Sequence, residues 1–281
     1  MYPVRRLLLT LFLAAASHAQ HLTNGLYAFD NGTGRDQKLP LADQAALIQR
    51  LGYAGVAYTG TDALPQLLHE LDTRGLDLLS IYVASWADGR TPAYDPGVPQ
   101  AIRQLKGRHT LILLTVQAPT PDADSRVVAT VREIADLAAA AGLKVCLYPH
   151  FGFQVARVED AVRIAELSGR ANVGVAFNLC HFLRAGDEAN LALRLRQAMP
   201  RLLFVSINGA DHTGDWDRLI QPLDRGEYDV PGFLRELDQA GYRGPIALQS
   251  YNIKGDIEDN LARSIKAWRA MRVKLPASRP N

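Results

Sequence analysis

The sequence predicts a single-domain α/β protein, a (β/α)8 TIM barrel, and three observations support this prediction. Apolar runs that suit buried parallel strands alternate eight times with amphipathic helical patterns, separated by short Gly, Pro or Asp segments. The chain has 281 residues, and removal of a 19-residue leader leaves 262, close to the ~250 residues of one barrel. Polar residues gather where the predicted strands end, and barrel enzymes carry their active sites at that end.

The strand and helix patterns follow one another in strict order. The segment V-G-V-A-F-N-L-C-H is apolar along its length and turns polar only at Asn178 and His181. The segment from Gly209 to Pro231 is long for a strand-to-helix connection, which predicts a functional loop. We expect strands at residues 25–30, 54–58, 76–83, 110–117, 143–148, 172–178, 202–207 and 245–249. We expect helices at residues 41–51, 62–74, 98–105, 125–141, 158–168, 188–199, 230–240 and 256–271.

An open, doubly wound sheet is the alternative architecture. Such a sheet usually carries a G-x-G-x-x-G phosphate loop after its first strand. The segment that follows Asp30 reads N-G-T-G-R-D and lacks this spacing. The closed barrel is therefore favoured.

Residues 1–19 have the features of a secretory signal peptide. Arg5 and Arg6 precede a short apolar run, and Ser17 and Ala19 occupy the small-residue positions of a cleavage site. The run is too short for a membrane span of ~20 residues. We therefore expect an exported protein, periplasmic or secreted, whose barrel covers residues 20–273 and whose tail, residues 274–281, is disordered.

Charge and cysteine content restrict the possible partners. Without Arg5 and Arg6 the chain holds 29 basic and 29 acidic residues, so neither nucleic-acid binding nor an anionic membrane surface is indicated. No other stretch is long and apolar enough to span a membrane, so no insertion is expected after cleavage. Cys146 and Cys180 both lie in apolar strand contexts, where buried free cysteines are common. Pairing is open to them in an exported protein, although no spacing pattern supports a disulfide.

The residues at the predicted strand ends form a polar, aromatic-rich rim with few charges. Amide, hydroxyl and imidazole groups suit a polyol, and no phosphate loop or Lys/Arg cluster accompanies them. The sequence therefore predicts an unphosphorylated small-molecule carbohydrate as the ligand. The candidate binding residues are Asp30, Tyr82, Trp86, Gln117, Tyr148, Asn178, Asn208, His212 and Gln249.

Two histidines at neighbouring strand ends, His150 and His181, are the candidates for proton transfer, because imidazole titrates near neutral pH. Asp211 is a candidate base or orienting carboxylate, with a loop cap as the alternative. His212 and Trp216 lie in the long loop, either as ligand contacts or as solvated residues. Nucleophilic catalysis is not indicated, since G-x-S-x-G is absent and the cysteines lack a clear activating base.

Four segments resemble the sugar phosphate isomerase/epimerase proteins of the xylose isomerase-like barrel superfamily. They read Y-P-H-F-G-F, F-N-L-C-H-F-L-R-A-G, V-S-I-N-G-A-D and G-Y-R-G-P-I-A-L-Q-S-Y-N. The resemblance implies a divalent metal held by a Glu, an Asp, a His and a second Glu. This sequence has Tyr148, Asn178, Ser206 or Asn208, and Gln249 at those positions, whereas His181 matches a histidine common in that family.

These replacements remove three formal negative charges, and a neutral amide is a far poorer metal ligand than a carboxylate. Three interpretations remain open. The first is an exported isomerase- or epimerase-like enzyme, with elimination as a further possibility, in which His150 or His181 moves a proton next to a sugar carbonyl. The second holds a metal, zinc for example, through His150, His181 and Asp211 or His212. The third is a non-catalytic sugar-binding barrel. The first interpretation is our prediction.

Overall fold

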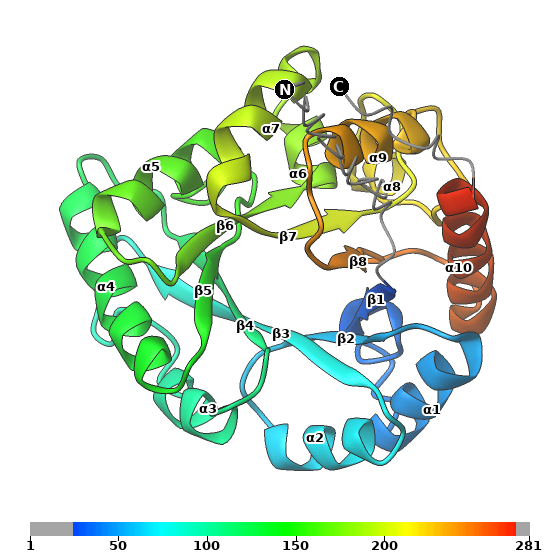
Figure 1. Cartoon of the computed structure of the whole chain (residues 1–281), viewed down its shortest axis with the longest axis horizontal. Coiled ribbons are helices and arrows are strands. Elements are labelled where there is room, and N and C mark those ends of the chain that lie inside the picture. The colour runs from blue at the N-terminus through cyan, green and yellow to red at the C-terminus, as the bar shows by residue number, and fades with distance from the viewer. Residues whose placement is uncertain (1–24, 274–281) are drawn as a thin grey trace, which may run out of the picture.

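The computed structural model describes residues 25–273, and these form one closed barrel of eight parallel strands (Figure 1). Each strand pairs with the next in the chain, and the eighth closes the ring on the first. The helices lie outside this ring. The predicted barrel is confirmed. The predicted signal peptide and the predicted disordered tail lie outside the described residues.

The predicted strands are all present, with ends that shift by a few residues. The strands are β1 (Leu26–Phe29), β2 (Gly55–Thr59), β3 (Asp77–Trp86), β4 (Leu111–Gln117), β5 (Lys144–Leu147), β6 (Val173–Asn178), β7 (Leu202–Ile207) and β8 (Ile246–Leu248). The helices are α1 (Leu41–Leu51), α2 (Leu64–Asp72), α3 (Val98–Gln104), α4 (Asp124–Ala140), α5 (Val158–Ser168), α6 (Leu179–Arg184), α7 (Leu191–Ala198), α8 (Trp216–Leu219), α9 (Val230–Gln239) and α10 (Ile257–Val273).

Two of these helices, α6 and α8, were not predicted from the sequence. Each has six residues or fewer, which is too short for an amphipathic period to stand out. The α6 helix begins directly at the end of β6 and places His181 in its first turn. The expected helix at 188–199 is shorter and consists of α7 between two 3-10 turns.

The core has two parts, and the alternation of side chains along each strand separates them. In β5, Val145 and Leu147 pack outward against the helices, whereas Cys146 belongs to the barrel interior together with Tyr148, just beyond the strand. Phe204 fills the interior from β7 and is fully buried. Residues that follow the same two-residue alternation as this inner set therefore point into the barrel. At the carboxyl ends of the strands, these are the residues that line the opening of the barrel.

The connection from β7 to α9 folds back on itself. Gly209 and Gln221 exchange two main-chain hydrogen bonds, of 3.0 and 2.7 Å, and the Tyr228 N–H donates to the Ala210 carbonyl. A Cβ at Gly209 would lie 2.1 Å from the Pro222 carbonyl oxygen, so this close approach requires glycine. The segment that carries Trp216 is thus fixed by main-chain bonds.

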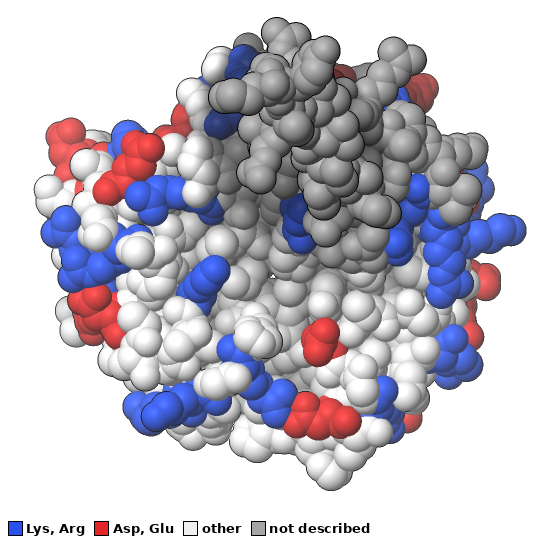
Figure 2. Space-filling view, in the orientation of Figure 1, with Lys and Arg blue, Asp and Glu red and all other residues white. Residues whose placement is uncertain are grey.

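In Figure 2, side chains of both charge signs lie on the left, lower and right edges of the face. Within residues 25–273, no helix is long and apolar enough to cross a membrane. Cys146 and Cys180 are both free thiols and buried. Burial raises the pKa of each thiol, so both stay protonated at neutral pH.

Candidate functional site

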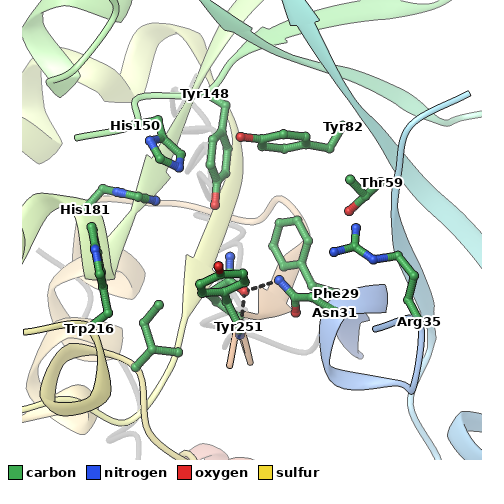
Figure 3. A pocket seen from close by; sticks show the side chains of 12 residues that line it. Phe29, Asn31, Arg35, Thr59, Tyr82, Tyr148, His150, His181, Trp216 and Tyr251 are labelled. Atoms are coloured by element: carbon green, nitrogen blue, oxygen red, sulfur yellow. Dashed lines mark hydrogen bonds between the residues drawn. The ribbon is translucent and has the colours of Figure 1, made fainter. Parts of the chain in front are cut away.

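A cavity of about 360 Å³ opens among the carboxyl ends of the strands (Figure 3). This volume lies near the lower end of the ~300–1,000 Å³ typical of small-molecule sites. In Figure 3, His150, His181 and Trp216 lie on one side of the cavity, and Thr59, Arg35 and Asn31 lie on the other. The cavity is lined by Phe29, Asn31, Arg35, Thr59, Tyr82, Tyr148, His150, His181, Trp216, Ile220, Gln249 and Tyr251.

The two candidate histidines lie side by side in the cavity wall. Their ring centroids are 3.9 Å apart. His150 also stacks on Phe153 at 3.8 Å, and His181 packs edge-on against Trp216 at 5.0 Å. Both imidazoles are therefore held in place by aromatic neighbours.

The main chain of Phe151 contacts both histidines and fixes their tautomers. The Phe151 N–H donates to Nδ1 of His181 over 3.2 Å, so the proton of a neutral His181 resides on Nε2. The Phe151 carbonyl accepts from Nδ1 of His150 over 3.0 Å, so Nε2 of His150 carries a lone pair. One histidine thus offers a donor to a ligand, and the other offers an acceptor.

Burial keeps both imidazoles neutral. It lowers the pKa of His150 below 6.5, with hydrogen bonds to the main chain opposing the effect. Burial lowers the pKa of His181 well below 6.5, and the neighbouring His150 lowers it further. The complementary donor and acceptor are consequently both present at neutral pH.

Two tyrosines form the inner end of the cavity. Tyr82 and Tyr148 pack edge-to-face with centroids 5.4 Å apart. Burial raises the pKa of Tyr82 to about 12 and that of Tyr148 well above 10, so both phenols stay protonated. Tyr148 Oη lies next to Ser206 and Gln249, yet makes no hydrogen bond of ordinary geometry within residues 25–273. Its hydroxyl therefore retains hydrogen-bonding capacity for a ligand.

The side-chain amide of Gln249 has a fixed orientation. Its Oε1 accepts hydrogen bonds from Asn31 Nδ2 at 2.6 Å and from the N–H groups of Ser250 and Tyr251 at 2.9 and 3.0 Å. Because two main-chain N–H groups donate to this atom, it must be the amide oxygen, and the flipped orientation with the nitrogen in its place is excluded. The NH2 group of Gln249 is therefore the part available as a donor.

A guanidinium also lines the cavity, although the sequence showed no cluster of Lys or Arg at the strand ends. Arg35 donates to Asp36 at 2.9 Å and lies 3.6 Å from Asp30. Asp30 itself accepts from the N–H and Oγ1 of Thr59. Two carboxylates thus offset this single positive charge, which differs from a phosphate-binding cluster.

Comparison with known proteins identifies the family. The model of the xylose isomerase-like TIM barrel matches residues 45–271, most of the chain. The chain belongs to the xylose isomerase-like TIM barrel family. L-ribulose 3-epimerase from Mesorhizobium japonicum is 26% identical over 157 residues. This match covers 56% of the chain and spans only 50% of that relative.

Similar solved structures have the same fold. The 3-keto-D-glucoside 4-epimerase from E. coli superposes with a TM-score of 0.71 at 17% identity, covering 89% of this chain and all of that one. The IolI protein, solved with a bound zinc atom, gives a TM-score of 0.73 at 18% identity, covering 90% of this chain and all of that one. At these identities the likeness shows the fold alone.

The residues at the family's metal positions do not fit a divalent cation. Tyr148 is a neutral phenol, and the Oε1 of Gln249 is already occupied by three donors. The Asn178 Oδ1 accepts from the Cys180 thiol at 3.2 Å, and the remaining position offers only the Ser206 hydroxyl or the Asn208 amide. This set offers no carboxylate or imidazole. Among the described residues, no group of three or more His, Cys, Asp or Glu could hold a metal ion.

Of the twelve residues predicted as catalytic or substrate-binding, the structure brings five together in the cavity wall and places seven outside it. The five are Tyr82, Tyr148, His150, His181 and Gln249. Asp30 is buried beneath the cavity, where it connects the ends of β1 and β2. Trp86 lies under the guanidinium of Arg90, and Gln117 ends β4 without lining the cavity.

The remaining predicted residues support the loops around the opening. Asn178 is buried and paired with Cys180, and the Asn208 amide donates to the carbonyls of Gly209 and Leu219. Asp211 pairs with Arg218 and accepts from the Glu227 N–H. His212 is half exposed and lies 2.8 Å from Glu188. Neither Asp211 nor His212 reaches the cavity, so the geometry gives them no part in a shared site with the two histidines.

Several lining residues did not emerge from the sequence. Phe29 and Thr59 follow the inward alternation of β1 and β2, so exact strand register would have found them, whereas Asn31 lies in a 3-10 turn just after β1. Arg35 and Ile220 lie in irregular segments, and no periodic signal marks them. Trp216 was considered as a ligand contact and does line the cavity.

Proposed function

We propose that this protein is an isomerase- or epimerase-type enzyme that transfers a proton next to the carbonyl of an unphosphorylated sugar. The observation that carries the proposal is the fixing of His150 and His181 in opposite neutral tautomers by Phe151. A sugar enolisation needs one group that takes a proton from carbon and one that stabilises charge on oxygen. The two imidazoles supply this pair.

In the proposed reaction, Nε2 of His150 takes a proton from the carbon next to the carbonyl. The electrons of that C–H bond form the C=C bond of an enolate, and the carbonyl π electrons move to oxygen. The Nε2–H of His181 donates to this oxygen and stabilises its charge. If the proton returns to the carbon it left, on the opposite face, the oxygen electrons restore the carbonyl and an epimer forms. If it returns to the former carbonyl carbon, the hydroxyl proton of the neighbouring carbon moves to the former carbonyl oxygen, a new carbonyl forms at that neighbouring carbon, and the product is an isomer.

The other polar groups of the cavity suit a polyol. The NH2 of Gln249 and the Tyr148 hydroxyl offer hydrogen bonds to hydroxyl groups, and the aromatic rings offer faces to C–H surfaces. The names of the similar epimerases, which act on L-ribulose and a 3-keto-D-glucoside, support the assignment to sugar chemistry. We propose no step through a metal, because the donor set does not fit one.

We also propose that the protein is exported after cleavage behind Ala19. The proposal rests on the Arg5–Arg6 pair, the apolar run and the small residues of the predicted cleavage site. Amino-terminal sequencing of the mature protein from fractionated cells tests it. Mature protein that still begins at Met1 would contradict it.

Deuterium incorporation from D2O tests the proposed reaction. Unphosphorylated aldoses and ketoses are incubated with the protein, and the mass of each recovered sugar is measured. We expect one deuteron at the carbon next to the carbonyl, and loss of this signal in His150→Gln. His69→Gln, at an exposed histidine of α2, is the matched control. Tight sugar binding without any exchange would indicate a sugar-binding barrel instead.

A further inference from the structure

The exposed aromatic side chains of the described residues are concentrated at the cavity. Phe151 is 40% exposed and Tyr251 is 50% exposed, and the other exposed large apolar side chains of residues 25–273 are leucines. Tyr251 lines the cavity, and Phe151 directly follows His150 in its wall. Large aromatic rings in water favour an apolar partner, so their position at one opening indicates a contact surface.

A continuous series of rings leads from the reacting groups to this surface. The ring centroids of His181 and Trp216 lie 5.0 Å apart, and those of Trp216 and Phe151 lie 6.4 Å apart at an angle of 71°. Trp216 lines the cavity, whereas Phe151 extends beyond it. The two rings therefore form a corner that begins inside the cavity and ends in solvent.

Arg184 holds this corner in place. Its guanidinium lies over Phe151 at 5.5 Å and over Trp216 at 5.6 Å. It also donates to the Gly214 carbonyl at 2.7 Å and lies 3.4 Å from Asp215. Cation–π contacts with two rings order side chains that would otherwise rotate in water, so the corner is preorganised for a ligand.

We propose that Phe151, Trp216 and Tyr251 form a second subsite that binds a sugar ring linked to the reacting sugar. The substrate is then a disaccharide or another glycoside rather than a free monosaccharide. One face of a pyranose presents C–H groups that pack on aromatic rings, while its hydroxyl edges stay hydrated. This inference rests on the proposed function for the location of the reacting sugar.

Calorimetric titration of the mature protein tests the subsite by binding alone. The probes are glucose with maltose and cellobiose, galactose with lactose, and xylose with xylobiose. We expect at least one disaccharide to bind about five- to tenfold more tightly than its constituent monosaccharides. If no disaccharide exceeds its monosaccharides, the proposal is wrong.

Single substitutions test which residues cause the tighter binding of disaccharides. In Phe151→Ala, which keeps the main chain that contacts the histidines, we expect the ratio of monosaccharide to disaccharide Kd to fall to about one. Leu167→Ala removes a 49% exposed side chain at the carboxyl end of α5 and should leave the ratio unchanged. An unchanged ratio in Phe151→Ala would overturn the assignment.

Fluorescence gives a second measurement. The disaccharide should change the emission of the wild-type protein, and Trp216→Phe should abolish most of this change because Trp268 is buried and Trp86 lies outside the cavity. A full emission change in Trp216→Phe would place the ligand elsewhere.

The outcome of these binding experiments is separate from that of the proposed reaction. A protein that prefers disaccharides but shows no deuterium exchange would keep the subsite and lose the proton transfer.

Discussion

The imidazoles of His150 and His181 lie 3.9 Å apart and offer opposite hydrogen-bonding groups at their Nε2 atoms, because one residue, Phe151, contacts both Nδ1 atoms. In the sequence, the two histidines are equivalent candidates for proton transfer. The structure distinguishes an acceptor from a donor, and this difference leads to the first prediction.

The two histidines should respond differently to substitution. His150→Gln removes the proposed base and should lower the exchange rate about 100-fold or more. His181→Leu removes the donor and should cost about 100-fold, whereas His181→Gln keeps an NH2 donor and should retain more activity. Exchange rates from D2O measure all three. Full exchange in both His150→Gln and His181→Leu would exclude the assignment.

The reaction should tolerate mildly acidic solution. The base form of His150 is neutral, and burial lowers its pKa below 6.5. A plot of kcat/KM against pH should therefore be flat near neutrality and should fall on the acid side, with an apparent pKa below 6.5. An acid limb centred above 6.5 would show that another group, or a charged His150, controls the rate.

Stability should also decrease in acid. Both buried histidines have lowered pKa values in the folded state, so below pH 6.5 the unfolded chain binds more protons than the folded one. The free energy of unfolding should then fall as the pH drops from 6.5 toward the folded-state values. Denaturant titrations at several pH values measure this fall. His181→Gln should give a shallower dependence, and an equal slope would contradict the explanation.

Metal ions should not stabilise the protein through the family's metal positions. The side chains at these positions, Tyr148, Asn178, Ser206 or Asn208, and Gln249, are neutral and offer no carboxylate, so a tight complex with Mn²⁺ is not expected. Millimolar Mn²⁺ should leave Tm unchanged, and EDTA should not lower it. One equivalent of metal that survives dialysis, with a lower Tm after its removal, would disagree with the donor set.

Asp211 should matter for stability rather than for proton transfer. It pairs with Arg218 and accepts from the Glu227 N–H, outside the cavity. Asp211→Asn keeps an acceptor but loses the charge, which should lower the free energy of unfolding by about 1 kcal/mol. Exchange by the folded variant should stay within about twofold of the wild type. If the variant folds but shows no deuterium exchange into the sugar, Asp211 does take part in catalysis.

The barrel was predictable because its strands and helices obey strong periodic patterns. The alternation around β5 places Tyr148 inside the barrel, and the same two-residue step leads to His150 at the cavity. The family motifs also led to His181, although the six-residue helix that carries it gave no periodic signal. Position along the strands thus gave the main cavity residues.

Side-chain environment was harder to predict. Asp30 and Asn208 occupy strand ends like the cavity residues, yet the Asp30 carboxylate accepts from Thr59 and the Asn208 NH2 group donates to the Leu219 carbonyl. Such pairings depend on contacts between distant segments. Arg35 reached the cavity from an irregular turn, and the roles of His150 and His181 depend on main-chain atoms that the sequence does not distinguish.

The main-chain bonds between Gly209 and Gln221 have a kinetic consequence. They fix the segment that presents Trp216, so this part of the cavity wall exists before a ligand arrives. Capture of a sugar then needs no slow ordering step in this segment. Differences in affinity among sugars should therefore arise mainly from how long each one stays bound, with similar rates of arrival.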